Sequence, residues 1–210
     1  EAAGTSFNLA NELIDLMNSI IEANPEKFFL IDTSTYLGNL PGQNLIGIAY
    51  GMENGAALEG NLSNVEYFYK RGIRYITLTH SKSNHISDSS YDENKQWGGL
   101  STFGKELVSE MNNIGMIIDI SHVSDEAFMQ VLDISKVPVI ASHSSLRYFT
   151  PGWERNISDE MLIALANNGG VLQINFGSKF INYAEQNDDE YNFATVSQTV
   201  DHFDRAISLV

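Results

Sequence analysis

Short apolar runs alternate along this chain with stretches in which apolar residues recur every three or four positions. Short runs of this kind are typical of strands buried on both faces, and the periodic stretches are typical of amphipathic helices. The pattern predicts strands over 45–55, where the strand runs into a turn, and over 74–80, 116–122, 137–143 and 170–176. It predicts helices over 7–27, 61–73, 101–115, 124–135, 158–169 and 196–210.

The connections and helix ends carry their own signals. Residues 28–43 are expected to be short-stranded or irregular, with a loop marked by Gly38, Pro41 and Gly42, and a polar loop is expected from Ser81 to Gly99. Ser101 or Thr102 is the expected N-cap of its helix, and Gly115 is expected just past the end. In the first helix the apolar positions at spacings of three and four are Leu9, Leu13, Leu16 and Ile20.

Strands that alternate with helices predict a parallel sheet with right-handed crossovers, either an open doubly wound α/β sheet or a closed (β/α)8 barrel. No glycine-rich phosphate loop follows the first strands, which favours the barrel. A barrel of this TIM type usually needs about 250 residues, whereas the chain has 210 and five predicted strands. We therefore expect residues 1–210 to be one domain, the central part of an incomplete barrel whose first strands and last strand lie outside the chain.

Charge and composition limit the kinds of partner and of metal ligand that are expected. Lys and Arg total 12 against 27 Asp and Glu, a formal net charge of -15, so binding to nucleic acid or to an anionic membrane surface is not expected. Without cysteine, any metal ion must be held by His, Asp and Glu. The chain has no run of about 18 apolar residues and no initiator Met, so we expect a soluble processed protein or a piece of one, whether cytoplasmic or extracytoplasmic.

Four polar side chains fall at the C-terminal ends of successive predicted strands: Glu53, His80, His122 and His143. The loops at that end of a (β/α)8 barrel build its active site, so these groups are expected on one rim. Two imidazoles and a carboxylate suit Zn²⁺ and similar ions, and a catalytic site keeps one position open for water. His80 is a further ligand or a donor to a developing oxyanion. Serines beside the histidines, Ser121 or Ser142, are candidates to orient them.

Five other polar residues have competing interpretations. His85 and Asp88 lie on the long polar loop, where a structural role is favoured. Asp119 lies within a strand and is equally compatible with a buried structural carboxylate and with a place in the site. Arg155, just before a helix, is equally compatible with a carboxylate-binding role and with a helix-flanking salt bridge. His202 lies within the last helix and is expected on the surface.

Several long motifs in this order resemble those of the membrane (renal) dipeptidase family, over about residues 45–176: "GMENG", "GIRYITLTHSKSN", "WGGLSTFGKELVSEMNNIGMIIDISHVSDEAF", "PVIASHSSLR" and "RNISDEMLIALANNGGVLQINF". The resemblance implies a (β/α)8 barrel with two zinc ions. By position, it implies that Glu53 bridges the two ions and that His122 and His143 complete the second zinc site. It also implies that His80 contacts the substrate and the tetrahedral intermediate, and that Arg155 binds the substrate carboxylate.

The implied reaction is zinc-dependent hydrolysis of dipeptides by a metal-bridging hydroxide, with tolerance for a D-residue at the C-terminal position, in a protein that often pairs as a homodimer. The family's first strand ends in a His-x-Asp motif for the other zinc, and its last strand ends in an Asp, and neither strand-end motif is found in this chain. Only one ligand set is therefore expected here, and full activity is expected of the parent enzyme. The alternatives are another amidohydrolase-type metal hydrolase, such as a lactonase or deacylase, and a catalytically incomplete metal-binding module.

Overall fold

The computed structural model describes residues 4–31, 44–182 and 192–210. In these residues five parallel strands form one sheet in the order β3, β4, β5, β6, β7, and β1 and β2 form a separate parallel pair. The five predicted strands are present, but the strand predicted over 45–55 divides into β2, which pairs with β1, and β3, which belongs to the five-stranded sheet. The predicted loop at Gly38, Pro41 and Gly42 lies outside the described residues. The strands are β1 (Phe28–Leu30), β2 (Ile46–Ile48), β3 (Tyr50–Glu53), β4 (Ile73–Thr77), β5 (Ile117–Asp119), β6 (Ile140–Ser144) and β7 (Val171–Ile174).

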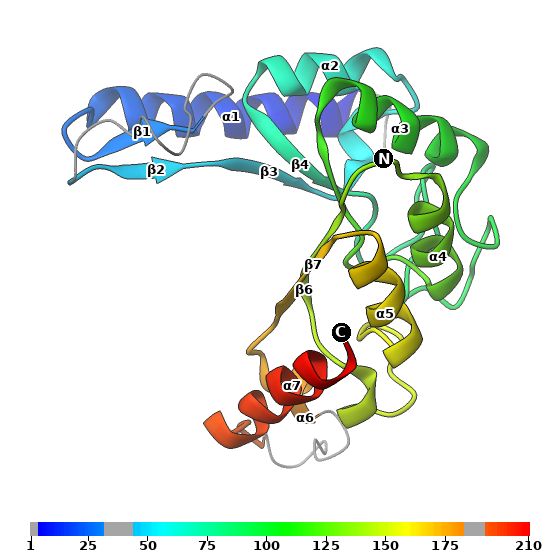
Figure 1. Cartoon of the computed structure of the whole chain (residues 1–210). Coiled ribbons are helices and arrows are strands. Elements are labelled where there is room, and N and C mark those ends of the chain that lie inside the picture. The colour runs from blue at the N-terminus through cyan, green and yellow to red at the C-terminus, as the bar shows by residue number, and fades with distance from the viewer. Residues whose placement is uncertain (1–3, 32–43, 183–191) are drawn as a thin grey trace.

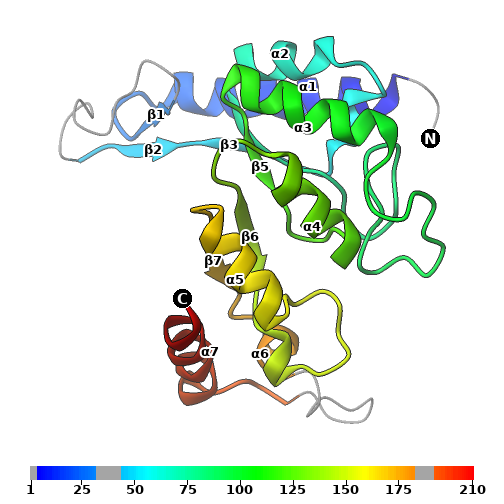
Figure 2. The same cartoon turned by 45° about the vertical axis from the view of Figure 1, so that its right-hand side comes forward.

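Helices cover one side of this sheet (Figures 1 and 2). Successive helices α2, α3, α4 and α5 contact one another in chain order, and α7 contacts α5 and α6. A parallel sheet with one helix after each strand is the arrangement of a (β/α)8 barrel, so the described residues match part of such a barrel. The helices are α1 (Thr5–Ala23), α2 (Ser63–Lys70), α3 (Thr102–Ile114), α4 (Asp125–Ile134), α5 (Asp159–Asn167), α6 (Ser178–Asn182) and α7 (Val196–Leu209), with 3-10 turns η1 (Gly55–Leu58) and η2 (Arg147–Phe149).

Hydroxyl side chains cap the N-termini of α3, α4, α5 and α7, whereas α2 has no side-chain cap. Ser101, Ser124 and Ser158 each accept a hydrogen bond from the backbone N–H three residues later, and Thr195 forms a capping box with Gln198. Gly115 ends α3 with a φ of 78°, a left-handed conformation that glycine adopts without a side-chain clash. The predicted N-cap and C-terminal glycine of α3 are confirmed, so local sequence sets where this helix begins and ends.

The core lies between the sheet and its helices. The helices α2, α3, α4 and α5 each contribute a large side chain that is at most 1% exposed, namely Phe68, Leu107, Phe128 and Leu165. Burial of one such side chain contributes about 1.5–3 kcal/mol, so this packing holds the strand ends in fixed relative positions. Among the described residues, no helix combines the length and the apolarity that a membrane span requires.

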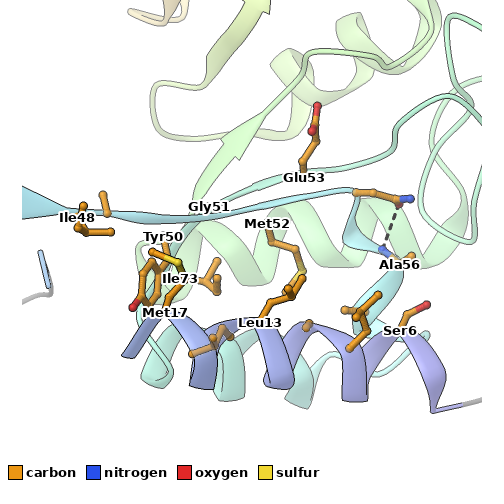
Figure 3. Close-up of a pocket in the computed structure, with 16 residues that line it drawn as sticks. Ser6, Leu13, Met17, Ile48, Tyr50, Gly51, Met52, Glu53, Ala56 and Ile73 are labelled. Atoms are coloured by element: carbon orange, nitrogen blue, oxygen red, sulfur yellow. Dashed lines mark hydrogen bonds between the residues drawn. The ribbon is translucent and has the colours of Figure 1, made fainter. Parts of the chain in front are cut away.

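The first helix is apolar on more than one face. Its leucines at the predicted periodic positions, Leu9, Leu13 and Leu16, are 54–55% exposed, whereas Ile14 is buried. A pocket of about 500 Å³ lies between α1 and β3. Figure 3 shows Met52 pointing from β3 toward α1, while the carboxylate of Glu53 points to the opposite side of the strand. Glu53 also lines this pocket, but alternate strand residues face opposite sides, so its carboxylate points away from the apolar side chains and toward the polar site described below (Figure 3).

Candidate metal centre

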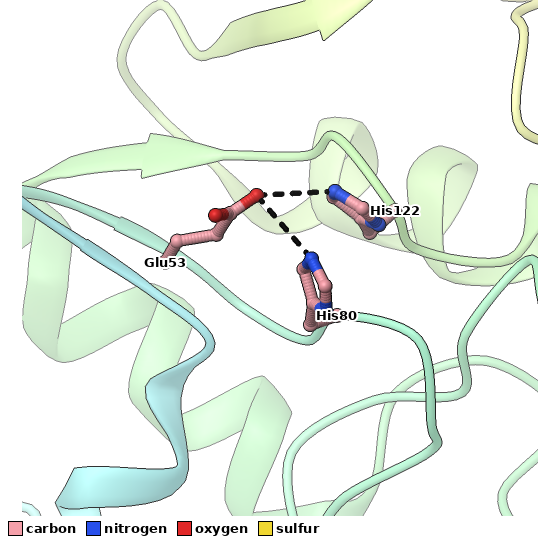
Figure 4. A group of neighbouring side chains, drawn as sticks. All are labelled: Glu53, His80 and His122. Atoms are coloured by element: carbon pink, nitrogen blue, oxygen red, sulfur yellow. Dashed lines mark ion pairs between the residues drawn. The ribbon is translucent and has the colours of Figure 1, made fainter.

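The four predicted strand-end residues meet at the C-terminal edge of the sheet. Glu53 is the last residue of β3, His143 lies near the end of β6, and His80 and His122 follow β4 and β5 by three residues. Figure 4 shows the imidazoles of His80 and His122 directed toward the Glu53 carboxylate. Parallel strands with equivalent ends thus bring together side chains that are up to 90 positions apart in the chain.

Three donor atoms of this group are close enough to share one ion. The Oε1 of Glu53 lies 3.0 Å from Nε2 of His143 and 3.2 Å from Nε2 of His122, and the two Nε2 atoms are 2.8 Å apart. Ligand atoms of a tetrahedral zinc with bonds of ~2.0–2.1 Å are roughly 3.3 Å apart, so the three donors fit one ion after a small adjustment. Two imidazole nitrogens at 2.8 Å also need a proton or a cation between them, because two lone pairs repel.

His80 lies at the edge of this triangle. Its Nε2 is 3.7 Å from Oε1 of Glu53, and the ligand atoms of Glu53, His80 and His122 all lie within 4.8 Å of one another. The ring centroids of His80 and His122 are 4.3 Å apart. The His80 side chain is 44% exposed, against 7% for His122. His80 is therefore within reach of an ion and, unlike His122, is open to a ligand arriving from solvent.

The electrostatics favour uncharged imidazoles. Burial, the Arg155 charge and the neighbouring histidines together lower the pKa of His122 to about 2. Burial and Arg155 also lower the pKa of His143, although Asp119 and Glu53 act in the opposite direction. A neutral imidazole keeps the lone pair that a metal ion needs. The donor set of one carboxylate and two neutral imidazoles thus has the chemistry of a zinc site.

Backbone strain marks the same place. His122 has a φ of 71°, and Asn54, the residue after Glu53, has a φ of 76°. Residues other than glycine rarely adopt this left-handed region, and they do so most often at functional sites, at a cost of about 1–3 kcal/mol each. No signal in the sequence indicates the strain at His122, whereas the asparagine before Gly55 is a common turn former.

Arg155 is 2% exposed and forms no ion pair with any residue that the structure describes. Its Nη1 donates to Oγ of Ser144 at 2.8 Å, its Cζ lies 4.9 Å from the Phe180 ring centroid, and its Nε and Nη2 are buried without a hydrogen-bond partner. Burial lowers its pKa to about 10, although Tyr91, Asp119 and Glu53 act in the opposite direction. The helix-flanking salt bridge is wrong, and the unpaired donors leave a cationic place for an anion.

Two of the remaining candidates are structural. Asp88 is fully buried and accepts N–H bonds from Gln96, Trp97 and Gly99, which hold the long loop closed, as its structural interpretation predicts. The prediction that His202 lies on the surface is wrong. It is fully buried, its Nδ1 accepts from the N–H of Leu146 at 3.1 Å, and its Nε2 lies 3.2 Å from the carbonyl oxygen of Ile181. Mid-helix position alone does not distinguish a satisfied buried imidazole from an exposed one.

Three aromatic residues beside the site were not predicted from the sequence. Trp153 lies between Tyr91 and Phe180, with ring centroids 6.3 Å and 5.0 Å away, and the Tyr91 ring is 5.9 Å from that of His122. They come from irregular segments and from α6, where hydrophobic periodicity carries no information. The aromatic cluster therefore contacts His122 through Tyr91 and Arg155 through Phe180.

Fold and site together define the class: an α/β protein whose parallel sheet gathers imidazoles and a carboxylate at the C-terminal ends of its strands. A family model described as "Membrane dipeptidase (Peptidase family M19)" matches residues 2–210, and the chain belongs to this family. The fold expectation and the resemblance stated above are confirmed.

Named relatives agree with this family. An uncharacterized dipeptidase of Schizosaccharomyces pombe is 40% identical over 159 residues, which cover 75% of this chain and 37% of that protein. Dipeptidase 3 of Mus musculus is 33% identical over 209 residues, 98% of this chain and 40% of that protein. A crystal structure of an amidohydrolase from Pseudomonas aeruginosa superposes with a TM-score of 0.84 at 26% identity, over 97% of this chain and 59% of that one. The chain thus spans well under half the length of these curated relatives.

Proposed function

We propose that the protein containing this chain hydrolyses dipeptides with bound zinc, and that Glu53, His122 and His143 hold one of two zinc ions. The mutual distances of 2.8–3.2 Å among their three donor atoms carry the proposal. A zinc pair supplies, when bound, a water activated at neutral pH and a polarised scissile carbonyl. Glu53 is the residue proposed to bridge the two ions, and the remaining ligands of the other ion are proposed to lie outside residues 1–210, the central part of one barrel domain.

His80 is proposed to contact the substrate. Its Nε2 lies 3.7 Å from Oε1 of Glu53, and its Nδ1 is 3.0 Å from Oγ of Ser81. A ring that faces the ligand set and remains partly open to solvent is suited to donate a hydrogen bond to the oxygen on which negative charge develops during amide cleavage. This assignment leaves His122 and His143 as the ligands and gives the third histidine a distinct role.

Arg155 is proposed to bind the free carboxylate of the dipeptide. A buried guanidinium with two unpaired donor atoms can take a carboxylate through two parallel N–H bonds. Its charge already acts on the pKa of both His122 and His143, so the anion would bind next to the ligand set. An arginine in this place favours cleavage of the bond next to the C-terminal residue, because only the last residue of a peptide carries a free α-carboxylate.

The first experiment compares wild-type full-length protein with its His143→Ala variant. We expect the variant to lose about one zinc equivalent, measured by mass spectrometry of the metal, and to lose nearly all dipeptide hydrolysis. Ser81→Ala, next to His80 and outside the proposed ligand set, serves as the control that should keep its zinc content. Full zinc content with normal turnover in His143→Ala would refute the assignment.

A panel of substrates distinguishes the proposed reaction from its alternatives. Dipeptides with a C-terminal L- or D-residue, N-acyl amino acids and lactones are offered in parallel. Hydrolysis of both dipeptides supports a dipeptidase that tolerates a D-residue, whereas turnover of only the acyl or lactone compounds supports another amidohydrolase-type hydrolase. Zinc binding without turnover of any substrate supports a catalytically incomplete module. The homodimer that the family resemblance suggests is tested by sedimentation of the same full-length protein.

A further inference from the structure

A buried carboxylate beside the proposed ligands is fully occupied by hydrogen bonds. Asp119 ends β5 and has no exposed surface. Its Oδ2 accepts from the hydroxyls of Thr77 at 2.6 Å and Ser142 at 2.5 Å, and its Oδ1 accepts from the backbone N–H groups of Ser121 at 3.0 Å and Ser142 at 2.9 Å. Four donors on two oxygens fill the acceptor capacity of an ionised carboxylate. Asp119 is therefore in the form that accepts hydrogen bonds and donates none.

The hydroxyl of Ser142 connects this carboxylate to a proposed ligand. Its Oγ lies 2.5 Å from Oδ2 of Asp119 and 2.7 Å from Nδ1 of His143. A serine hydroxyl has one hydrogen, and because Asp119 only accepts, that hydrogen lies toward Asp119. The oxygen of Ser142 must then accept from an N–H at Nδ1 of His143. In the neutral imidazole the lone pair is left on Nε2, the atom that lies 3.0 Å from Oε1 of Glu53 and 2.8 Å from Nε2 of His122, whose N–H then supplies the proton between the two rings in the metal-free protein.

We propose that Asp119 acts through Ser142 as a positioning residue, which holds His143 in the Nδ1–H tautomer and presents its Nε2 lone pair toward Glu53 before a metal ion binds. We call the hydrogen-bonded chain from Asp119 through Ser142 to His143 the Asp119 relay. Its role in metal binding rests on the proposed zinc function, but the tautomer is a property of the protein alone. The hydroxyl of Ser121 adds to the same assembly, because it accepts the backbone N–H of His143 at 3.0 Å.

The other two site histidines are held differently. The Nδ1 of His80 faces Ser81, whose hydroxyl contact is exposed. The Nδ1 of His122 is buried and has no hydrogen-bond partner among the described residues. Ser81→Ala is therefore a matched control, because it removes a hydroxyl that contacts an imidazole Nδ1 without touching the Asp119 relay.

Asp119→Asn provides the sharpest test. Its Oδ1 can keep both backbone N–H bonds, and an amide nitrogen in place of Oδ2 can donate to the hydroxyls of Thr77 and Ser142. The number of hydrogen bonds at residue 119 is unchanged, but the hydroxyl of Ser142 is now free to donate its hydrogen to Nδ1 of His143. The relay then runs in reverse and favours the Nε2–H tautomer, which has no lone pair directed at Glu53.

The tautomer is measured by long-range ¹H–¹⁵N correlation spectra of the full-length, ¹⁵N-histidine-labelled protein freed of metal by a chelator. His143→Asn identifies the signals of His143 by their loss. We expect the Nδ1–H form in wild type and in Ser81→Ala, the Nε2–H form in Asp119→Asn, and a mixture in Ser142→Ala that Ser142→Thr restores. Nε2–H in wild type, or an unchanged tautomer in both Asp119→Asn and Ser142→Ala, would overturn the proposal.

Zinc affinity, measured by competition with a chromophoric chelator, is the second readout. Loss of a hydrogen-bond partner behind a histidine ligand typically weakens metal binding about 10–100-fold, which is expected for Asp119→Asn and Ser142→Ala, while Ser81→Ala should stay within about 2-fold of wild type. A wild-type protein that binds no zinc but has the expected tautomers would refute the proposed function and support the relay. Wild-type affinity in both relay variants would overturn its role in metal binding.

Discussion

Replacing Arg155 with leucine should stabilise the substrate-free protein. Burial lowers the pKa of Arg155 to about 10, well below the ordinary value for a guanidinium, although Tyr91, Asp119 and Glu53 act in the opposite direction. At ~1.4 kcal/mol for each tenfold change in proton affinity, the buried charge costs about 3 kcal/mol at neutral pH. The bond to Ser144 and the contact with Phe180 offset ~1–2 kcal/mol of that cost. Arg155→Leu should therefore raise the free energy of unfolding by about 1–2 kcal/mol.

The same substitution should weaken binding of a free carboxylate. Two charge-assisted hydrogen bonds contribute about 2–4 kcal/mol together, so kcat/KM for free dipeptides should fall by roughly 30-fold to 1000-fold. Carboxyl-amidated dipeptides cannot form this ion pair, and their kcat/KM should change little. Stability is measured by urea unfolding at pH 7, and kinetics on the full-length zinc-loaded protein.

Arg147→Leu is the matched control. Arg147 forms a bidentate pair with Asp125 at 2.5 and 2.6 Å on the same segment, so its loss should lower stability by about 1 kcal/mol without changing the preference for a free carboxylate. A loss of more than about 1 kcal/mol of stability in Arg155→Leu would contradict the prediction, because it would show that the guanidinium stabilises the fold. Equal losses in kcat/KM on free and amidated dipeptides would also refute the carboxylate role.

Three further predictions concern stability, each measured by urea unfolding. Burial lowers the pKa of His202 in the folded protein. The contribution of the neutral ring to the free energy of unfolding is therefore complete above the unfolded pKa of ~6.5 and is lost as pH falls below that value. His202→Asn should flatten the dependence of the free energy of unfolding on pH between pH 7 and 5. Burial acts to raise the pKa of Asp88, but N–H bonds from Gly99, Gln96 and Trp97 lower it overall. The contribution of the ionised Asp88 to the free energy of unfolding is therefore present above the ordinary carboxyl pKa of ~4 and is lost as pH falls through the lowered value. Asp88→Asn should lower the free energy of unfolding at pH 7 and change it little at pH 2.5. Gly104→Ala should destabilise by more than about 1 kcal/mol despite the better helix propensity of alanine, because the new Cβ would lie 2.2 Å from the carbonyl oxygen of Ile86; unchanged stability would contradict this.

The sheet and the gathering of donors were predictable because both depend on local patterns. Each strand is an apolar run, three of the five sheet strands are followed by a helix with a serine N-cap, and a polar residue at the end of such a run must lie at the sheet edge. Glu53, His80, His122 and His143 all occupy such positions. The roles of these residues remain predictions, because position at the rim does not distinguish a ligand from a hydrogen-bonded neighbour.

Contacts between residues that lie far apart in the chain could not be predicted from the sequence. The pairing of Arg155 depends on which side chains surround it after folding, and its partner Ser144 belongs to another segment. His202 is buried because its ring bonds to Leu146 and Ile181, which lie 56 and 21 positions away. Polarity and helical position describe a residue's own element and carry no information about such partners.

The two Ser-His pairs illustrate where local patterns stop. Both serines stand directly before a proposed ligand, which suggests that each orients its own neighbour. In the structure both serines act on His143: Ser142 faces its Nδ1, and Ser121 accepts its backbone N–H, while Nδ1 of His122 has no partner among the described residues. The difference arises because Asp119 binds the backbone of both serines through one oxygen and therefore ties β5 to β6. Both copies of the Ser-His dipeptide thus position the same histidine, His143. The single hydrogen of Ser142 decides which way the hydrogen bond between Ser142 and His143 runs.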